Sequence, residues 1–165
     1  MIGVDLGLNV GSITRIDKDG RVRDSLVLKF EKKGQEDDHA RCEVTAIRFA
    51  NQIAAMAQRA GVKQIVVIEE PIFSWGRKNP KGFAKNVALI TLVQSRLAVY
   101  RGQVKRIKTI NNKTAKRLAG GGGKDKAAMI AAFKKKTGNF PGHSTKYGQE
   151  TLADSYFIAL AGYES

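Results

Sequence analysis

QIVVIEEP, residues 64–71, is the stretch of this 165-residue sequence that best indicates its fold. Its four consecutive apolar residues, Ile65 to Ile68, suit a short strand, and an unbroken apolar run indicates a central strand covered on both faces. Glu69 and Glu70 follow at once, so two adjacent carboxylates stand where the strand ends. The stretch therefore predicts a buried strand of an α/β fold, with acidic groups at its end that need an explanation.

The sequence before this strand predicts an antiparallel meander. Residues 1–7, 10–16 and 21–30 form three expected strands, and the Asp-Gly turn of residues 17–20 favours a hairpin between the last two. Another strand is expected at 103–109, with helices at 40–60, 83–100, 125–136 and 149–163 and a helical turn after residue 111. The pattern predicts a mixed five-stranded sheet, with a three-stranded antiparallel meander plus parallel strands, flanked by helices in a single domain over 1–165.

Two of the expected helices have informative apolar patterns. Helical spacing in 40–60 relates four apolar residues, which are Val44, Ile47, Ile53 and Met56. In the helix at 83–100, apolar residues cover more than half of the circumference. That second helix is therefore expected to be either deeply buried or shared with a partner chain.

The charge of the chain points to a polyanionic partner. It has 29 Lys and Arg against 15 Asp and Glu, a net charge of +14. Nucleic acid is favoured over a membrane surface, because neutralised phosphates release counterions and because no basic amphipathic helix with a bulky apolar face is evident. One cysteine and two histidines exclude an internal disulfide, a Cys-based zinc site and a histidine cluster. Without a signal peptide or membrane-span pattern, we expect an intracellular protein.

Five carboxylates, at three places in the chain, lie in apolar sequence. Asp5 ends the first expected strand, Glu69 and Glu70 end the fourth, and Glu150 and Asp154 share one face of the last helix. Carboxylates gathered in a weakly solvated place repel one another, and a divalent cation removes that penalty. Two Mg²⁺ ions about 3.5–4 Å apart can position a water and stabilise a leaving oxygen in phosphodiester cleavage.

Each of these carboxylates also has a simpler reading. Asp5 could cap a turn, and Asp-x-Gly after a strand also occurs in ATPases of the actin and sugar-kinase type, although the chain is short for the two lobes of that fold. Glu69 and Glu70 could form a solvated strand end, and Glu150 could complement a helix dipole. Asp154 alone would most often lie on the surface. Their conjunction in one basic chain favours a metal site.

Four segments together resemble the RuvC-type Holliday junction resolvases of the RNase H-like (retroviral integrase) superfamily. They are IGVDLGLNVGS (2–12), VVIEEPIF (66–73), LAGGGGKDKAAMIAA (118–132) and ETLADSYFIALAGY (150–163). They occur in the order and at the spacing of that family across the whole chain. The resemblance implies an RNase H-like fold, and the compact, strongly basic sequence is weakly similar to small phage-type members.

The resemblance implies a role for each embedded acid. Asp5 and Asp154 match metal ligands of the family, and Glu69 matches a third, with Glu70 as the second choice. The fourth family acid falls where this chain has Thr151, and Glu150 is the substitute because both positions share a helix face. The implied cofactor is Mg²⁺, with two ions per site and Mn²⁺ able to replace it.

The resemblance also implies a DNA-binding surface and a dimer. In the family, one lysine precedes a Gly-x-Gly segment and another stands at the start of the following helix. Lys116 lies one residue from the first of these positions, and Lys126 matches the second. Aromatic residues after the catalytic strand stack on bases in the family. The expected DNA contacts are Phe73, Trp75, Arg77, Lys78, Lys81, Lys85, Lys116, Gly121, Gly122, Lys124 and Lys126. The helix at 83–100 matches the dimer helix of the family, and a C₂ dimer offers two identical sites to a four-way junction.

These features predict a homodimeric, Mg²⁺-dependent, structure-selective endonuclease for Holliday junctions and other branched DNA. It would leave 5′-phosphate and 3′-hydroxyl ends in DNA recombination and repair, in the cytoplasm of a bacterial or phage-infected cell, without a membrane or a nucleotide cofactor. Two alternatives stay open. One is an RNase H-like nuclease for RNA–DNA hybrids or flaps, and the other is a junction-binding protein without catalysis.

Overall fold

A computed structural model describes residues 1–31, 37–71, 80–118, 126–138 and 146–164. Along the chain its elements are β1 (Ile2–Asp5), β2 (Val10–Ile16), β3 (Val22–Lys29), α1 (Asp38–Arg59), β4 (Gln64–Glu69), α2 (Pro80–Leu97), β5 (Val104–Ile110), α3 (Asn112–Leu118), α4 (Lys126–Thr137) and α5 (Lys146–Glu164). In these described ranges, no helix is long and apolar enough to cross a membrane.

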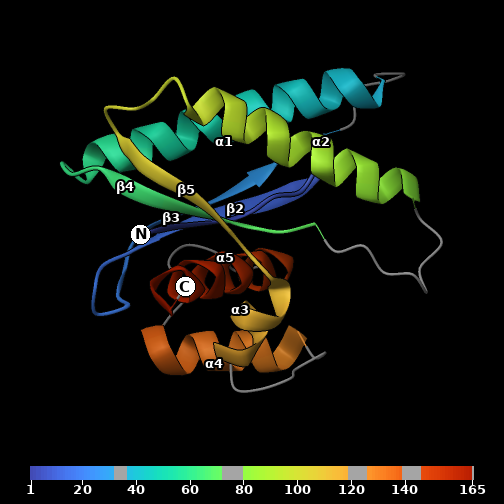
Figure 1. The fold of residues 1–165 in the computed structure, drawn as a ribbon. Coiled ribbons are helices and arrows are strands. Elements are labelled where there is room, and N and C mark those ends of the chain that lie inside the picture. The colour runs from blue at the N-terminus through green and yellow to red at the C-terminus, as the bar shows by residue number, and fades with distance from the viewer. Residues whose placement is uncertain (32–36, 72–79, 119–125, 139–145, 165) are drawn as a thin grey trace.

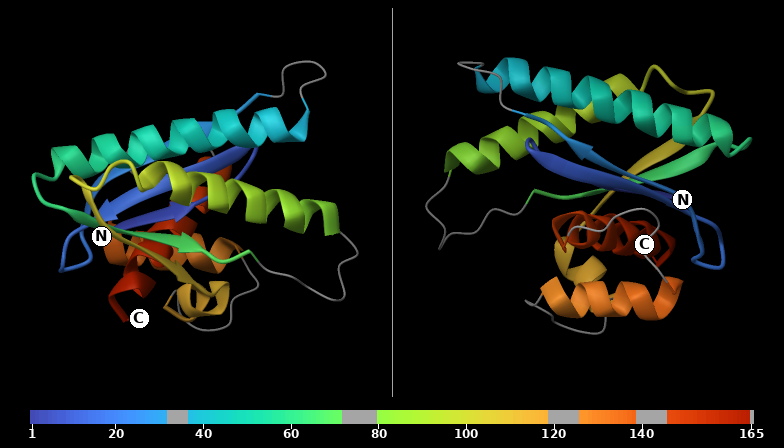
Figure 2. Two further views of the ribbon diagram at one scale, coloured as in Figure 1. Left: turned by 45° about the horizontal axis from the view of Figure 1, so that its top comes forward. Right: turned by 180° about the vertical axis from the view of Figure 1, so that it is seen from behind.

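The five strands form one mixed sheet in the order β3-β2-β1-β4-β5. β1, β2 and β3 pair antiparallel, whereas β4 lies parallel to both β1 and β5. Helices α1 and α2 cover one face of the sheet, and α5 covers the other with α3 and α4 beyond it (Figures 1 and 2). The predicted fold class, a meander followed by parallel strands between helices, is confirmed.

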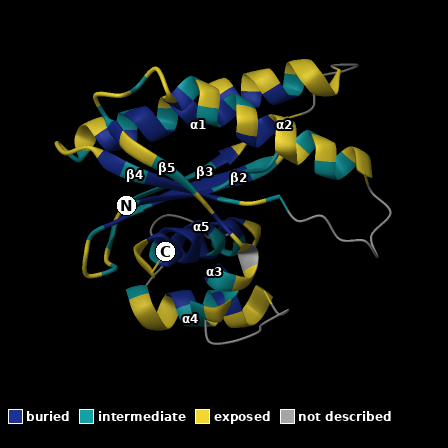
Figure 3. Ribbon diagram, in the orientation of Figure 1, coloured by how far each residue is buried: buried dark blue, intermediate teal, exposed yellow. Residues whose placement is uncertain are grey.

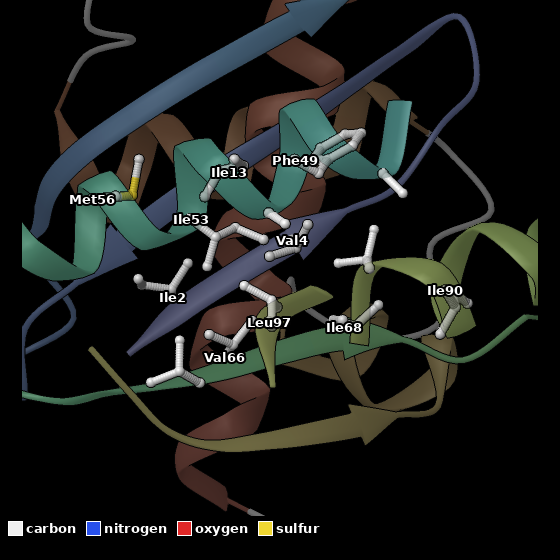
Figure 4. Close-up of a cluster of buried hydrophobic side chains, with 14 of the residues drawn as sticks. Ile2, Val4, Ile13, Phe49, Ile53, Met56, Val66, Ile68, Ile90 and Leu97 are labelled. Atoms are coloured by element: carbon white, nitrogen blue, oxygen red, sulfur yellow. The ribbon is translucent and has the colours of Figure 1, made fainter. Parts of the chain in front are cut away.

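The continuous apolar run of β4 is explained by burial on both faces. Val66 and Ile68 join the core under α1 and α2, together with Ile2 and Val4 of β1 (Figure 4). Val67 points the other way, into the core that α5 and α4 form. Burial colours show that the sheet centre and the inner side of α5 are buried (Figure 3).

Two helix predictions need correction. Val44 and Ile47 are exposed on α1, at 50% and 37%, and Phe49 with Ala46 faces the sheet instead. Ile53 and Met56 are buried as predicted, and small alanines beside them let the helix axis lie close to the sheet. α2 begins at Pro80 and ends at Leu97, three residues earlier at each end than expected. Proline suits a first helical turn, where its missing N–H costs nothing.

α5 packs directly on the backbone of β1 at Gly3. A Cβ atom there would overlap the carbonyl oxygen of Ser155 and the amide of Ala159, both in the α5 backbone. We therefore expect Gly3→Ala to lower the free energy of unfolding by about 3 kcal/mol, because the helix must move off the sheet. Gly102→Ala is the matched control, since a Cβ there meets nothing within 4 Å. Equal urea-unfolding midpoints for the two variants would contradict this packing.

Candidate active site

The two carboxylates at strand ends lie side by side. β1 and β4 are parallel neighbours, and Val4 is aligned with Ile68, so Asp5 and Glu69 end their strands at the same edge of the sheet. Asp154 lies on the third turn of α5 and reaches this edge from the face of the sheet that α5 covers (Figure 1). Gly3 allows this approach, because it lets α5 lie against β1.

Shifted pKa values show that these carboxylates act on one another. Burial raises the pKa of Asp5 well above its usual range, and the charges of Asp154 and Glu69 raise it further. The pKa of Asp154 is raised to about 6, first by burial and then by Glu69, with a smaller contribution from Glu150. Lys126 opposes both shifts. The edge therefore concentrates negative charge that nearby lysines only partly balance.

The structure distinguishes the two adjacent glutamates. Both line a hollow of about 250 Å³ beside Asp5. The charge of Glu69 raises the pKa of both Asp5 and Asp154. The Glu70 carboxylate instead accepts a hydrogen bond of 3.2 Å from the Thr109 hydroxyl of β5. The arrangement favours Glu69 as the residue that shares a site with Asp5.

Helix α5 also distinguishes Glu150 from Thr151. Thr151 is buried against the sheet, and its carbonyl accepts a 2.6 Å hydrogen bond from the Ser12 hydroxyl. The Glu150 carboxylate accepts a hydrogen bond from Lys126 Nζ at 2.8 Å, and this contact raises the pKa of the lysine. Glu150 therefore lies at the margin of the acidic group, held by the lysine at the start of α4.

The donor set suits a hard divalent cation. Within the described ranges, no group of three or more His, Cys, Asp or Glu side chains is arranged closely enough to hold a metal. The interacting side chains Asp5, Glu69 and Asp154 nevertheless offer only oxygen donors, which Mg²⁺ prefers, and their mutual repulsion is what a bound cation would relieve. The residues therefore fit Mg²⁺ in the chemistry of their donor atoms.

Solved structures with a similar fold identify the architecture. A structure of T. thermophilus RuvC in complex with a Holliday junction substrate superposes with a TM-score of 0.67 at 20% identity, covering 98% of this chain and 92% of that one. A second structure of Thermus thermophilus RuvC gives a TM-score of 0.62 at 18% identity, with the same coverage. The chain has the RuvC fold. No protein-family model and no curated protein sequence matches it significantly.

Four of the expected DNA contacts lie in the described part of this RuvC fold. Lys81 is exposed in the first turn of α2. The positive charge of Lys116 on α3 lowers the pKa of Asp154 and so partly offsets its rise. Lys85 forms an ion pair of 2.6 Å with Asp38 at the start of α1, so its charge is partly compensated. Lys126 is held by Glu150. The remaining seven lie outside the described residues: Phe73, Trp75, Arg77, Lys78, Gly121, Gly122 and Lys124.

Sequence reasoning missed two features of the RuvC fold in this chain. Asn86 of α2 lines the hollow beside Asp5 and Glu69, and nothing in the sequence singled it out. The Thr14 hydroxyl hydrogen-bonds that of Ser155 at 2.7 Å, next to the bond from Ser12 to Thr151. Ser12 and Thr14 alternate on β2 and are fully buried, so their spacing was an available signal that they meet a helix.

Proposed function

We propose that this chain is a divalent-metal-dependent endonuclease that cuts four-way DNA junctions and other branched DNA. The observation that carries the proposal is the meeting of Asp5, Glu69 and Asp154 at one edge of a RuvC fold. Two facts support it: the net charge of +14, which favours DNA, and the Holliday junction bound by the similar T. thermophilus protein. Under this proposal, the protein takes part in DNA recombination and repair in the cytoplasm.

Asp5, Glu69 and Asp154, together with Glu150, would hold two Mg²⁺ ions. Bound Mg²⁺ supplies an activated water and stabilises the leaving oxygen in phosphodiester cleavage, which gives 5′-phosphate and 3′-hydroxyl ends. The chain itself fixes Asp5 at the end of a central strand and Asp154 on a helix pinned by the Ser12 and Thr14 hydroxyls. Lys126 lies beside Glu150, where its ammonium can contact a phosphate at the site.

The two glutamates of β4 should differ in effect. Glu69→Gln removes the charge that acts on Asp5 and Asp154, so we expect cleavage to fall at least about 100-fold. Glu70→Gln removes only a carboxylate bound to Thr109, so we expect a loss of less than about fivefold. Single-turnover cleavage of a labelled junction measures both. A larger loss in the Glu70 variant would reverse the assignment of the metal ligand.

A homodimer through 83–100 completes the proposal, because a junction needs two symmetric cuts. Its support is the exposed apolar surface of α2, where Ala84, Ala88 and Leu92 line an apolar groove of about 490 Å³ beside α1. We expect Ala88→Glu to give a monomer in analytical ultracentrifugation and to uncouple the two cuts. Val62→Glu, at an exposed position after α1, should stay dimeric. A dimeric Ala88 variant would place the interface elsewhere.

The direct test incubates the protein with a synthetic four-way junction, a linear duplex and an RNA–DNA hybrid, each with Mg²⁺ and with EDTA. Paired cuts in the junction, lost in EDTA, are the expected result. Tight junction binding without cutting under Mg²⁺ or Mn²⁺ would instead identify a recognition protein. Preferred cutting of the hybrid would retain the metal site and move the substrate to RNA–DNA.

A further inference from the structure

A second hollow, of about 290 Å³, lies between the end of β3 and the first half of α1. Its lining includes the side chains of Phe30, Arg41 and Arg48, and it shares no lining residue with the hollow beside Asp5. The charged residues that line it are Lys29, Arg41, Arg48 and Glu31, so their net charge is +2. No step of the chemistry proposed above uses it.

This second hollow lies at the same edge of the sheet as the carboxylates. Asp5 is aligned with Ser12, and Ser12 with Val27, so Lys29 lies two residues further along β3 toward the same edge. Two strand spacings and two residue rises put the backbone of Lys29 about 12 Å from that of Asp5. One strand of DNA covers that distance in about three to four nucleotides, at 3.4 Å of axial rise per phosphate.

The two arginines of the hollow are held by neutral groups. Arg41 donates to the side-chain oxygen of Asn9 at 2.7 Å, and Arg48 lies over the Phe30 ring, 4.9 Å from its centroid. In the part of the chain that the structure describes, neither guanidinium has a carboxylate within ion-pair distance. By contrast, Arg23, Arg59 and Arg117 each pair with a carboxylate. Arg41 and Arg48 are thus oriented but keep their charge for an external anion.

The hollow favours a phosphate over a base. Phe30 already contacts Arg48 and, at 5.6 Å between ring centroids, Phe49, so its ring is a poor platform for stacking a base. Guanidinium groups offer paired N–H donors that match phosphate oxygens. Arg41 also joins the hollow to the active site, because it binds the loop that follows Asp5.

We propose that this second hollow binds a backbone phosphate of a DNA arm, about three to four nucleotides from the phosphate that is cut. The inference rests on the proposed function, and it assigns to Arg48 and Arg41 the positioning of the arm and not the chemistry of the cut. DNA bound both at the carboxylates and in this hollow would have the cut phosphate at a fixed number of nucleotides from the phosphate in the hollow.

The test compares Arg48→Ala with Arg59→Ala, which removes the same group from the far end of the same helix. Junction affinity is measured in EDTA over a range of salt concentrations. We expect Arg48→Ala to weaken binding about fivefold to tenfold and to reduce the salt slope by about 0.9, the value for one lost phosphate contact. Arg59→Ala should bind like the unaltered protein, and Arg48→Lys should restore most of the loss.

Junctions with neutral methylphosphonate linkages then locate the contact. With such linkages three and four nucleotides from the cut, the difference between Arg48→Ala and the unaltered protein should disappear. Equal affinity of the Arg48 and Arg59 variants, or a difference that the neutral linkages leave unchanged, would overturn the inference. If the junction is bound but not cut in Mg²⁺, the proposed function fails, and the two arginine variants still decide the role of the hollow in DNA binding. Failure to bind any DNA would overturn both.

Discussion

Asp5→Asn is expected to abolish junction cleavage, with a loss on the order of 10³-fold or more in the single-turnover rate. Asp5 is the acid on which both Glu69 and Asp154 act, so its carboxylate lies at the centre of the acidic group. Replacing it with an amide keeps the shape but removes the charge that would hold a divalent cation. Junction affinity in EDTA should stay within about twofold or increase, because a negative charge near the phosphates is lost.

Asp19→Asn is the matched control for this loss. Asp19 lies in the exposed turn between β2 and β3, so the same chemical change occurs away from the sheet edge that carries the acids. Its cleavage rate should equal that of the unaltered protein. Full activity of the Asp5 variant in Mg²⁺ would refute a metal site at this edge, whereas loss of cleavage together with loss of junction binding would indicate damage to the fold.

The sequence was sufficient to predict strand β4 and the position of its carboxylates. An unbroken apolar run fixes a central strand, and parallel neighbours end at one edge, so Asp5 and Glu69 could be expected together. The choice between Glu69 and Glu70 could not be made, because it depends on Thr109 of β5, and pairing register is not encoded locally.

Helix phase was the other limit of sequence reasoning. On α1, Ala46 and Phe49 face the sheet together with the predicted Ile53, while Val44 is exposed, so the first half of the predicted apolar stripe had the wrong phase. On α5, hydrogen bonds from Ser12 and Thr14 set which side faces the sheet. These bonds join residues about 140 positions apart, so no local pattern reveals them.

Asp154→Asn is expected to stabilise the metal-free protein at pH 8 by about 3 kcal/mol, since the pKa of Asp154 rises from 3.8 to about 6 on folding and each unit corresponds to about 1.4 kcal/mol. The folded state holds the proton more tightly than the unfolded state. Its contribution to stability is therefore fully present below pH 3.8 and is lost as pH rises through about 6. The asparagine variant removes this loss, so the stabilities of the two proteins should converge near pH 4, diverge between about pH 4 and pH 6, and differ by a constant amount at higher pH.

Asp17→Asn provides a control of opposite sign. Backbone hydrogen bonds, first from Arg21, lower the pKa of Asp17, so its contribution is present at neutral pH and is lost as pH falls below its usual range. This variant should therefore be less stable than the unaltered protein at pH 8. Mg²⁺ adds a second criterion, because a ligand of the folded state raises stability with concentration. Mg²⁺ should stabilise the unaltered protein and have little effect on the Asp154→Asn variant. An equal response of both proteins would show that Asp154 is not a ligand of the metal.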